Sequence, residues 1–175
     1  MSETISVLIP REKIEERTKE IAAQINRDYK DRSIHIVCVL KGGVFFAVKL
    51  ANELTVPVTI DFMSVSSYGD DTKSSGVVKI VKDLDQPLIG KDVLLVEDII
   101  DSGRTLAYLM NLLRDRKPAS LRLCTLLDKP SRRVMPVSCD YTGFEIEDKF
   151  VVGCGMDYKQ VYRNLPYIGV VELGE

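Results

Sequence analysis

The sequence predicts an α/β fold in which a mostly parallel sheet is flanked by helices. Residues 34–40 are a nearly continuous apolar run, which is typical of a strand covered on both faces, and residues 92–97 and 121–127 also predict strands. Apolar residues at helical spacing follow the first two predicted strands, and strands that alternate with helices indicate a parallel sheet. The length of 175 residues fits a single domain, residues 1–175, and no repeat or linker divides it.

Composition and charge exclude several classes of protein. The 24 Lys and Arg against 26 Asp and Glu give a formal net charge of −2, which is too acidic for a protein that coats nucleic acid. The apolar runs are too short to cross a bilayer, and no secretory signal is visible. Four cysteines without metal-site spacing are expected to be small buried hydrophobes, and His35 is expected to be structural. We therefore expect a cytoplasmic protein with no membrane or nucleic-acid partner.

The first elements follow in order along the chain. Residues 11–29 place apolar side chains on one face among charged neighbours, which predicts an amphipathic helix. The apolar run at 34–40 predicts a strand, and the spacing of apolar residues from Val44 to Leu54 predicts the helix after it. Residues 58–65 predict the next strand.

A polar stretch at residues 66–82 then interrupts the alternation. It is rich in Ser, Gly and Asp and has little to bury, so it is expected to be either a lid over a site or an ordinary hairpin tip. The remaining predicted elements are, in order, a strand at 92–97, a helix at 103–114, a strand at 121–127, and short strands at 150–153 and 168–173.

Unusual residues gather where the predicted strands end. The three segments concerned are Lys41-Gly42-Gly43, residues 97–105 and Asp128-Lys129. Ligands of parallel α/β sheets bind beyond the carboxyl ends of the strands, at a switch in strand order. The three segments are therefore expected to form one site.

The start of the predicted helix at 103–114 has the features of an anion site. Backbone N–H groups of the turn, the hydroxyls of Ser102 and Thr105, and the helix dipole all favour a phosphate there. Gly103 allows the backbone to approach that phosphate closely.

Three acids in five residues precede this turn: Glu97, Asp98 and Asp101. Two carboxylates about 4 Å apart repel by roughly 4 kcal/mol at an effective dielectric near 20, so a cation or a polyhydroxyl ligand is expected to use them. A solvated helix cap is the alternative explanation, and it accounts for one acid but not for three. A phosphate site beside acids that can bind hydroxyl groups is the arrangement expected of a binding site for ribose 5-phosphate.

Residues 96–105 resemble the signature loop of the type I phosphoribosyltransferases, which bind 5-phosphoribosyl 1-diphosphate. The resemblance to the hypoxanthine-guanine group of this family extends over essentially the whole chain. It is carried by Val39-Leu40-Lys41-Gly42-Gly43, Ser67-Tyr68-Gly69, Gly90-Lys91-Asp92, Leu127-Asp128-Lys129, Phe150-Val151-Val152-Gly153, Asp157-Tyr158 and Tyr162-Arg163. Lys129 and residues 150–163 resemble the 6-oxopurine enzymes in particular.

The resemblance implies a purine salvage enzyme, a pentosyltransferase that moves the 5-phosphoribosyl group to N9 of hypoxanthine or guanine. The products would be IMP or GMP and diphosphate. Asp101 would be the general base at purine N7. Glu97 and Asp98 would hold the ribose hydroxyls and, through them, Mg²⁺, and Asp157 would hold a second Mg²⁺. The cradle of the 5-phosphate would be formed by Ser102, Gly103, Arg104 and Thr105, with Arg104 standing where many relatives have Lys.

The same resemblance implies roles for residues outside the signature loop. Lys41 and Gly42 would contact the diphosphate through the backbone, and Arg163 would pair with it. Lys129 would donate to the purine O6 and Phe150 would stack on the ring. The main chain of Val151 and Asp157 would read the remaining edge of the purine. Ser67 and Tyr68 would belong to the lid.

Two alternatives stay open: a xanthine-preferring phosphoribosyltransferase, and a pyrimidine-operon-type RNA-binding regulator on the same fold. Residues 116–133 supply some local positive charge for an RNA face, whereas the whole chain is slightly acidic. The resemblance further implies a small hood from the terminal segments over the base. It also implies a homo-oligomer, a dimer or tetramer.

Overall fold

The computed structural model describes residues 3–67 and 77–174. The strands are β1 (Glu3–Ile9), β2 (Ile34–Val39), β3 (Val58–Ser67), β4 (Val78–Lys82), β5 (Asp92–Ile100), β6 (Ser120–Asp128), β7 (Tyr141–Glu145), β8 (Val151–Val152) and β9 (Ile168–Leu173). The helices are α1 (Arg11–Asp28), α2 (Val44–Glu53) and α3 (Arg104–Arg114), with a 3₁₀ turn, η1 (Pro130–Arg132).

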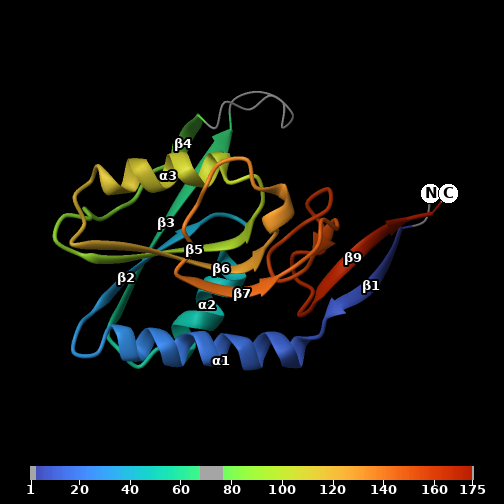
Figure 1. The fold of residues 1–175 in the computed structure, drawn as a ribbon, viewed down its shortest axis with the longest axis horizontal. Coiled ribbons are helices and arrows are strands. Elements are labelled where there is room, and N and C mark those ends of the chain that lie inside the picture. The colour runs from blue at the N-terminus through green and yellow to red at the C-terminus, as the bar shows by residue number, and fades with distance from the viewer. Residues whose placement is uncertain (1–2, 68–76, 175) are drawn as a thin grey trace.

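The central sheet has the strand order β4-β3-β2-β5-β6-β7. All neighbours in it are parallel except β3 and β4, which pair antiparallel at one edge. In Figure 1, α3 lies on one side of this sheet and α1 and α2 lie on the other. The predicted α/β class with a mostly parallel sheet flanked by helices is confirmed.

Strand β5 shows why its apolar run is continuous. Leu94 and Val96 pack in the cluster that contains the buried residues of α1 and α2. Val93 and Leu95 pack in the cluster that contains those of α3. Successive side chains of a strand point to opposite faces, so a strand covered on both faces is apolar at every position.

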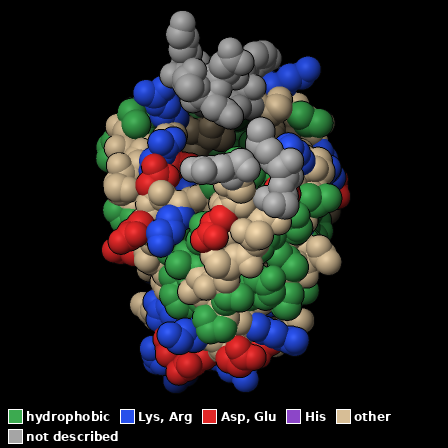
Figure 2. Space-filling view, turned by 90° about the vertical axis from the view of Figure 1, so that its right-hand side faces the viewer, with side chains coloured by type: hydrophobic (Ala, Val, Ile, Leu, Met, Phe, Trp, Pro, Cys, Tyr) green, Lys and Arg blue, Asp and Glu red, His purple; other side chains and the backbone are tan. Residues whose placement is uncertain are grey.

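The terminal segments form a second, three-stranded antiparallel sheet in the order β1-β9-β8, which is the predicted hood. Figure 1 shows β1 and β9 side by side beyond the end of the central sheet, with the two chain termini together. Figure 2 views the molecule from this end and shows a mainly hydrophobic area between two gatherings of charged side chains. Strand β1 was not predicted, because only Ile9 of its seven residues is buried and its apolar pattern is weak.

Two further strands were missed because they are short edge strands. The polar stretch predicted at 66–82 is shorter than expected, since Ser66 and Ser67 belong to β3 and residues 78–82 form β4. The structure anchors β4 by pairing it with β3 and by burying Val78. The other missed strand, β7, pairs with β6 at the opposite edge. None of the described helices is long and apolar enough to span a membrane.

Candidate active site

The candidate site lies where the carboxyl ends of β2 and β5 meet. These strands are parallel neighbours, but the chain leaves β2 through α2 toward β3 and leaves β5 through α3 toward β6. Because α2 and α3 cover opposite faces, the strand order switches direction between β2 and β5. Ligands of parallel sheets bind at such a point.

The three segments with candidate residues contact one another here. The Lys129 N–H donates to the Ile100 carbonyl at 3.0 Å. A Cβ at Gly42 would stand 1.9 Å from Asp98 Oδ2, and a Cβ at Gly155 would stand 1.9 Å from the Gly42 carbonyl oxygen. Glycine at both positions therefore lets two backbone segments approach the carboxylate at the end of β5.

Glu97 and Asp98 form a crowded pair of acids. The prediction ended this strand at Glu97, but the ladder with β6 continues past it to Ile100, so both acids are strand residues. Burial raises the pKa of Glu97 well above its ordinary value, and the neighbouring Asp98 raises it further. Burial also raises the pKa of Asp98, although the Ile99 N–H that donates to its Oδ1 at 2.7 Å opposes the rise. Such a pair favours a cation or hydroxyl groups beside it.

Asp157 and Arg163 lie on the hood side of these acids. Arg163 Nη2 is 3.1 Å from Asp157 Oδ1, and Arg163 Nη1 donates to the Gly155 carbonyl at 2.7 Å. Gln160 joins this group, since its N–H donates to Asp157 Oδ2 at 2.8 Å and its Oε1 accepts from Lys41 Nζ at 3.3 Å. The Leu40–Lys41 peptide, which precedes Gly42, is cis. The chain thus places two cations, Lys41 and Arg163, at one edge of the acidic pair.

The acids fit a hard cation that is held partly by its ligand. Glu97, Asp98 and Asp157 offer carboxylate oxygens only. Within residues 3–67 and 77–174, no group of three or more His, Cys, Asp or Glu side chains could hold a metal ion by itself. Mg²⁺ is commonly bound through one or two carboxylates together with substrate phosphates. The donor set therefore fits Mg²⁺ bound together with a phosphate-bearing substrate.

The predicted anion site occupies the start of α3. Gly103 is the residue before the helix and has φ 83°, a left-handed conformation that favours glycine. The first N–H groups of a helix lack partners within it, and no acidic residue stands in the first turn of α3 to compete for them. Ser102 Oγ accepts from the Arg104 N–H at 3.4 Å. Ser102 and Thr105 are both partly exposed.

The predicted base side combines a buried cation with an exposed aromatic ring. Lys129 is buried, with 7% of its surface exposed, and Phe150 is 54% exposed. The Phe150 ring meets Tyr158 edge to face, with centroids 5.6 Å apart. Val151, the next residue, is buried in β8 of the hood. An exposed, supported ring is suited to stack on a flat heterocycle, and a buried ammonium group is suited to donate to its polar edge.

A chain of ion pairs on the base side was not predicted. Arg132 Nε is 3.1 Å from Asp101 Oδ1, so the predicted general base is held by a neighbouring guanidinium. Asp148 lies 3.6 Å from Lys129 Nζ and 3.7 Å from Arg132 Nη1. The adjacent arginines Arg132 and Arg133 were the signal in the sequence, but the partners of Arg132, Asp101 and Asp148, lie in other segments of the chain.

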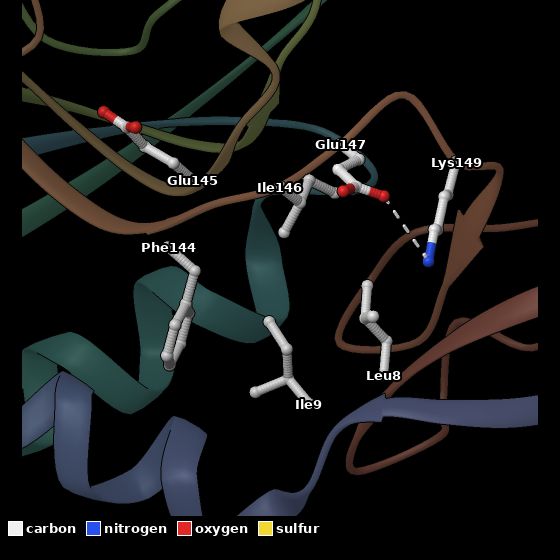
Figure 3. A pocket seen from close by; sticks show the side chains of 7 residues that line it. All are labelled: Leu8, Ile9, Phe144, Glu145, Ile146, Glu147 and Lys149. Carbon is white, nitrogen blue, oxygen red and sulfur yellow. Dashed lines mark ion pairs between the residues drawn. The ribbon is translucent and has the colours of Figure 1, made fainter.

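A separate pocket adjoins the connection that carries Asp148. The cavity has a volume of about 400 Å³. Figure 3 shows the side chains that line it, which are Leu8 and Ile9 of β1 and residues at and after the end of β7. Glu147 and Lys149 pair with each other there at 3.7 Å, whereas Asp148 between them pairs with Lys129 and Arg132. None of the candidate site residues lines the described part of this pocket, so it is distinct from the candidate site.

The basic residues considered for an RNA face are largely neutralised by acids. The pairs are Arg116 with Asp83, Arg122 with Asp28, Lys129 with Asp148, Arg132 with Asp101, and Arg133 with Asp128. Each partner is a carboxylate of the same chain. These five described residues therefore do not supply the surplus of positive charge that binding to an RNA backbone requires.

The lid prediction falls only partly on described residues. Ser67 is the last residue of β3, and Tyr68 lies outside the described residues. His35 is buried, and its Nδ1 lies 2.7 Å from Thr59 Oγ1, as a structural residue would. All four cysteines are free, and burial raises the pKa of each thiol.

Comparison with known proteins finds relatives that match nearly the whole chain. The model of the phosphoribosyl transferase domain family matches residues 9–159. The hypoxanthine-guanine phosphoribosyltransferase of Bacillus subtilis is 50% identical over 166 residues, covering 95% of this chain and 92% of the relative. The hypoxanthine phosphoribosyltransferase of Salmonella typhimurium is 50% identical over 175 residues, covering 99% and 98%.

A solved structure extends the similarity to three dimensions. The crystal structure of a hypoxanthine-guanine phosphoribosyltransferase from Bacillus anthracis matches with a TM-score of 0.93 at 45% identity, covering 98% of this chain and 100% of that one. Family match, identity and fold agree over nearly the full length. The chain therefore belongs to the phosphoribosyltransferase family, within the group of hypoxanthine-guanine phosphoribosyltransferases.

Proposed function

We propose that this enzyme transfers the 5-phosphoribosyl group of 5-phosphoribosyl 1-diphosphate to N9 of hypoxanthine or guanine. The observation that carries the proposal is the order of groups around the switch point. The anion site at the start of α3 follows directly on the acids of β5, and Lys129, whose N–H donates to the Ile100 carbonyl at 3.0 Å, would read the base together with the exposed Phe150. Phosphate, ribose and purine would lie against these three regions in that order.

On the phosphate side, residues Ser102 to Thr105 would hold the 5-phosphate through backbone N–H groups and two hydroxyls. Glu97 and Asp98 would accept hydrogen bonds from the ribose hydroxyls, so each carboxylate would have a hydrogen-bond donor. The N-terminal end of α3 favours the negative charge of the phosphate. These contacts would orient C1 of the ribose toward the purine.

The diphosphate would lie at the edge formed by Lys41, Gly42 and Arg163. Arg163 is already oriented by Asp157 and by the Gly155 carbonyl, so it need not be ordered during binding. One Mg²⁺, held through the ribose hydroxyls on Glu97 and Asp98, and a second, held by Asp157, would neutralise charge on the diphosphate leaving group. The carboxylates themselves would fix the position of the ribose.

On the base side, Asp101 would accept the proton from purine N7, which makes N9 more nucleophilic. The N9–C1 bond forms as the bond between C1 and the diphosphate oxygen breaks, and the diphosphate leaves with the electron pair. Lys129 would donate to O6, Phe150 would stack on the ring, and the backbone of Val151 and Asp157 would read the other edge. The products would be IMP or GMP.

The RNA-binding alternative is not favoured, because the arginines that could form an RNA face are paired with acids. A steady-state assay of hypoxanthine, guanine, xanthine and adenine with 5-phosphoribosyl 1-diphosphate and Mg²⁺ tests the proposal. We expect turnover of the two 6-oxopurines hypoxanthine and guanine to exceed that of adenine by at least tenfold. Preference for xanthine would assign the enzyme to the xanthine-preferring group, and absence of turnover with all four bases would refute the proposal.

We also propose that residues 1–175 act as one domain in a cytoplasmic homo-oligomer, a dimer or tetramer. The continuous sheet from β4 to β7 and the return of the C-terminus to pair with β1 support a single domain. Light scattering after size-exclusion chromatography measures the oligomer. A mass near 19.7 kDa, that of one chain, would contradict the proposed assembly.

A further inference from the structure

The anion site at the start of α3 is held from outside by a short segment after η1, residues 133–135, here called the supporting segment. The N–H groups of Val134 and Met135 donate to the Ser102 carbonyl at 2.8 and 3.1 Å. Arg133 Nη1 donates to the Asp101 carbonyl at 2.8 Å. Two consecutive carbonyl groups of the loop are therefore fixed by one segment.

Fixing these carbonyl groups also fixes the direction of the next N–H groups. In a trans peptide the C=O and the N–H of the following residue point in opposite directions. The Asp101 carbonyl faces Arg133, so the Ser102 N–H points away from it. The Ser102 carbonyl faces the supporting segment, so the Gly103 N–H also points away. These two N–H groups directly precede the first turn of α3, where the N–H groups of a helix have no carbonyl partner within the helix and an anion would bind.

Arg133 is anchored for this task by an ion pair. Its Nη2 pairs with Asp128, the last residue of β6, and the two side chains are only 19% and 13% exposed. Arg133 Cδ would lie 3.0 Å from a Cβ at Gly103, so the side chain also packs against the loop. The guanidinium is a rigid planar group, and it joins a fixed strand end to the Asp101 carbonyl. A side chain with one donor nitrogen lacks this fork.

We propose that Arg133 is a positioning residue for the 5-phosphate site: by holding the Asp101 carbonyl against the end of β6, it directs the Ser102 N–H toward the phosphate. The inference rests on the proposed function. Arg133 acts through the backbone and does not itself touch substrate. It differs in this from Arg132, which contacts the Asp101 carboxylate.

The test compares two ligands that differ only in the 5-phosphate. IMP and inosine are titrated into the full-length wild type and into Arg133→Ala, and the dissociation constants are measured by calorimetry or by inhibition of the forward reaction. We expect the dissociation constant of IMP to rise roughly tenfold in Arg133→Ala, because charge-assisted hydrogen bonds to phosphate are sensitive to donor direction. The constant for inosine should change by less than twofold.

Two further variants separate positioning from folding. Arg133→Lys keeps a cation beside Asp128 and preserves the partly buried ion pair, but it has no second nitrogen in a fixed plane to hold the carbonyl. We expect it to fold like the wild type and still to lose several-fold affinity for IMP. Arg116→Ala is the matched control, since Arg116 makes a two-point pair with Asp83 at 2.7 and 2.9 Å outside the candidate site. It should leave both dissociation constants unchanged.

The outcomes distinguish the inference from the function on which it rests. If IMP binding is unchanged in Arg133→Ala and Arg133→Lys, or if IMP and inosine weaken equally, Arg133 does not position the phosphate site. If the wild type binds IMP no more tightly than inosine, the proposed 5-phosphate site itself is wrong.

Discussion

The phosphate side and the base side of the candidate site are built in different ways. The phosphate side comes from one continuous segment, the end of β5 and the start of α3, with local geometry imposed by Gly103. The base side is assembled from η1, the connection before β8 and the hood, and ion pairs such as Lys129–Asp148 hold it together. A site divided in this way can bind one constant part, a phosphorylated sugar, through rigid backbone and discriminate the variable part through side chains.

This comparison predicts that the largest loss of turnover from a single substitution occurs at Asp101, where the two sides meet. Asp101→Asn keeps the shape of the side chain but cannot accept the N7 proton, so turnover should fall roughly a hundredfold or more. IMP affinity should change little, because the phosphate site is formed by other residues. The measurement is kcat with hypoxanthine together with the dissociation constant of IMP.

The matched control is Asp115→Asn, which changes an exposed aspartate just beyond the C-terminus of α3. It should retain normal turnover. Near-normal turnover in Asp101→Asn would remove Asp101 from the role of general base.

The second prediction concerns discrimination on the base side. Lys129 can donate to O6 of a 6-oxopurine, whereas it meets a second donor at the 6-amino group of adenine. An unpaired buried donor costs roughly 1–3 kcal/mol, so adenine should be disfavoured by tenfold to several hundredfold. Lys129→Gln supplies a carbonyl acceptor and should lower the ratio of kcat/KM for hypoxanthine over adenine. An unchanged ratio would mean that another residue reads the 6-position.

The sequence predicts the phosphate side better than the base side, because the residues of the phosphate side are close together along the chain. The acids, the turn and the helix of 97–105 are neighbours in the chain, so their common site could be inferred from local chemistry. The predicted strand ends at Glu97, earlier than β5 does, because adjacent acids are more typical of loops than of strands. In the structure, hydrogen bonds to β6 keep both acids in the strand.

The base side depended on resemblance to a family, because its contacts join distant segments. Arg132 and Asp101 are 31 residues apart and meet only once β5 and β6 are paired. Short edge strands such as β4 and β7 were missed for a similar reason, since pairing with a neighbour stabilises them more than their own sequence does.

The third prediction separates the two sides through substrate affinities. Phe150→Leu removes an exposed aromatic face that meets Tyr158 edge to face, and it keeps an apolar side chain. The KM for hypoxanthine should rise about fivefold, since aromatic contacts contribute roughly 0.5–1.5 kcal/mol beyond buried area. The KM for 5-phosphoribosyl 1-diphosphate should stay within twofold. Equal rises in both KM values would show that the two sides are not independent.

The smallest expected effect concerns the stability of the ligand-free enzyme and its dependence on pH. Burial raises the folded-state pKa of Glu97 above its ordinary value of 4.5, so the folded chain holds this proton more tightly than the unfolded chain does. The contribution of Glu97 to stability is therefore greatest below pH 4.5 and falls as pH rises toward the raised folded-state pKa. Glu97→Gln removes this loss, because glutamine resembles the protonated acid and never ionises.

We expect Glu97→Gln to match the wild type in acid and to exceed it at pH 8 by on the order of 1 kcal/mol, the usual size of a trade-off between stability and activity at a functional residue. Its activity should fall, since a neutral amide is a weaker partner for ribose hydroxyls and for Mg²⁺. Urea unfolding of both proteins at several pH values measures the gap. Glu145→Gln, which removes a carboxylate at an exposed position of β7, is the control. If Glu97→Gln is less stable than the wild type at pH 8, the Glu97 carboxylate stabilises the fold. The acids of β5 would then not reduce the stability of the ligand-free enzyme.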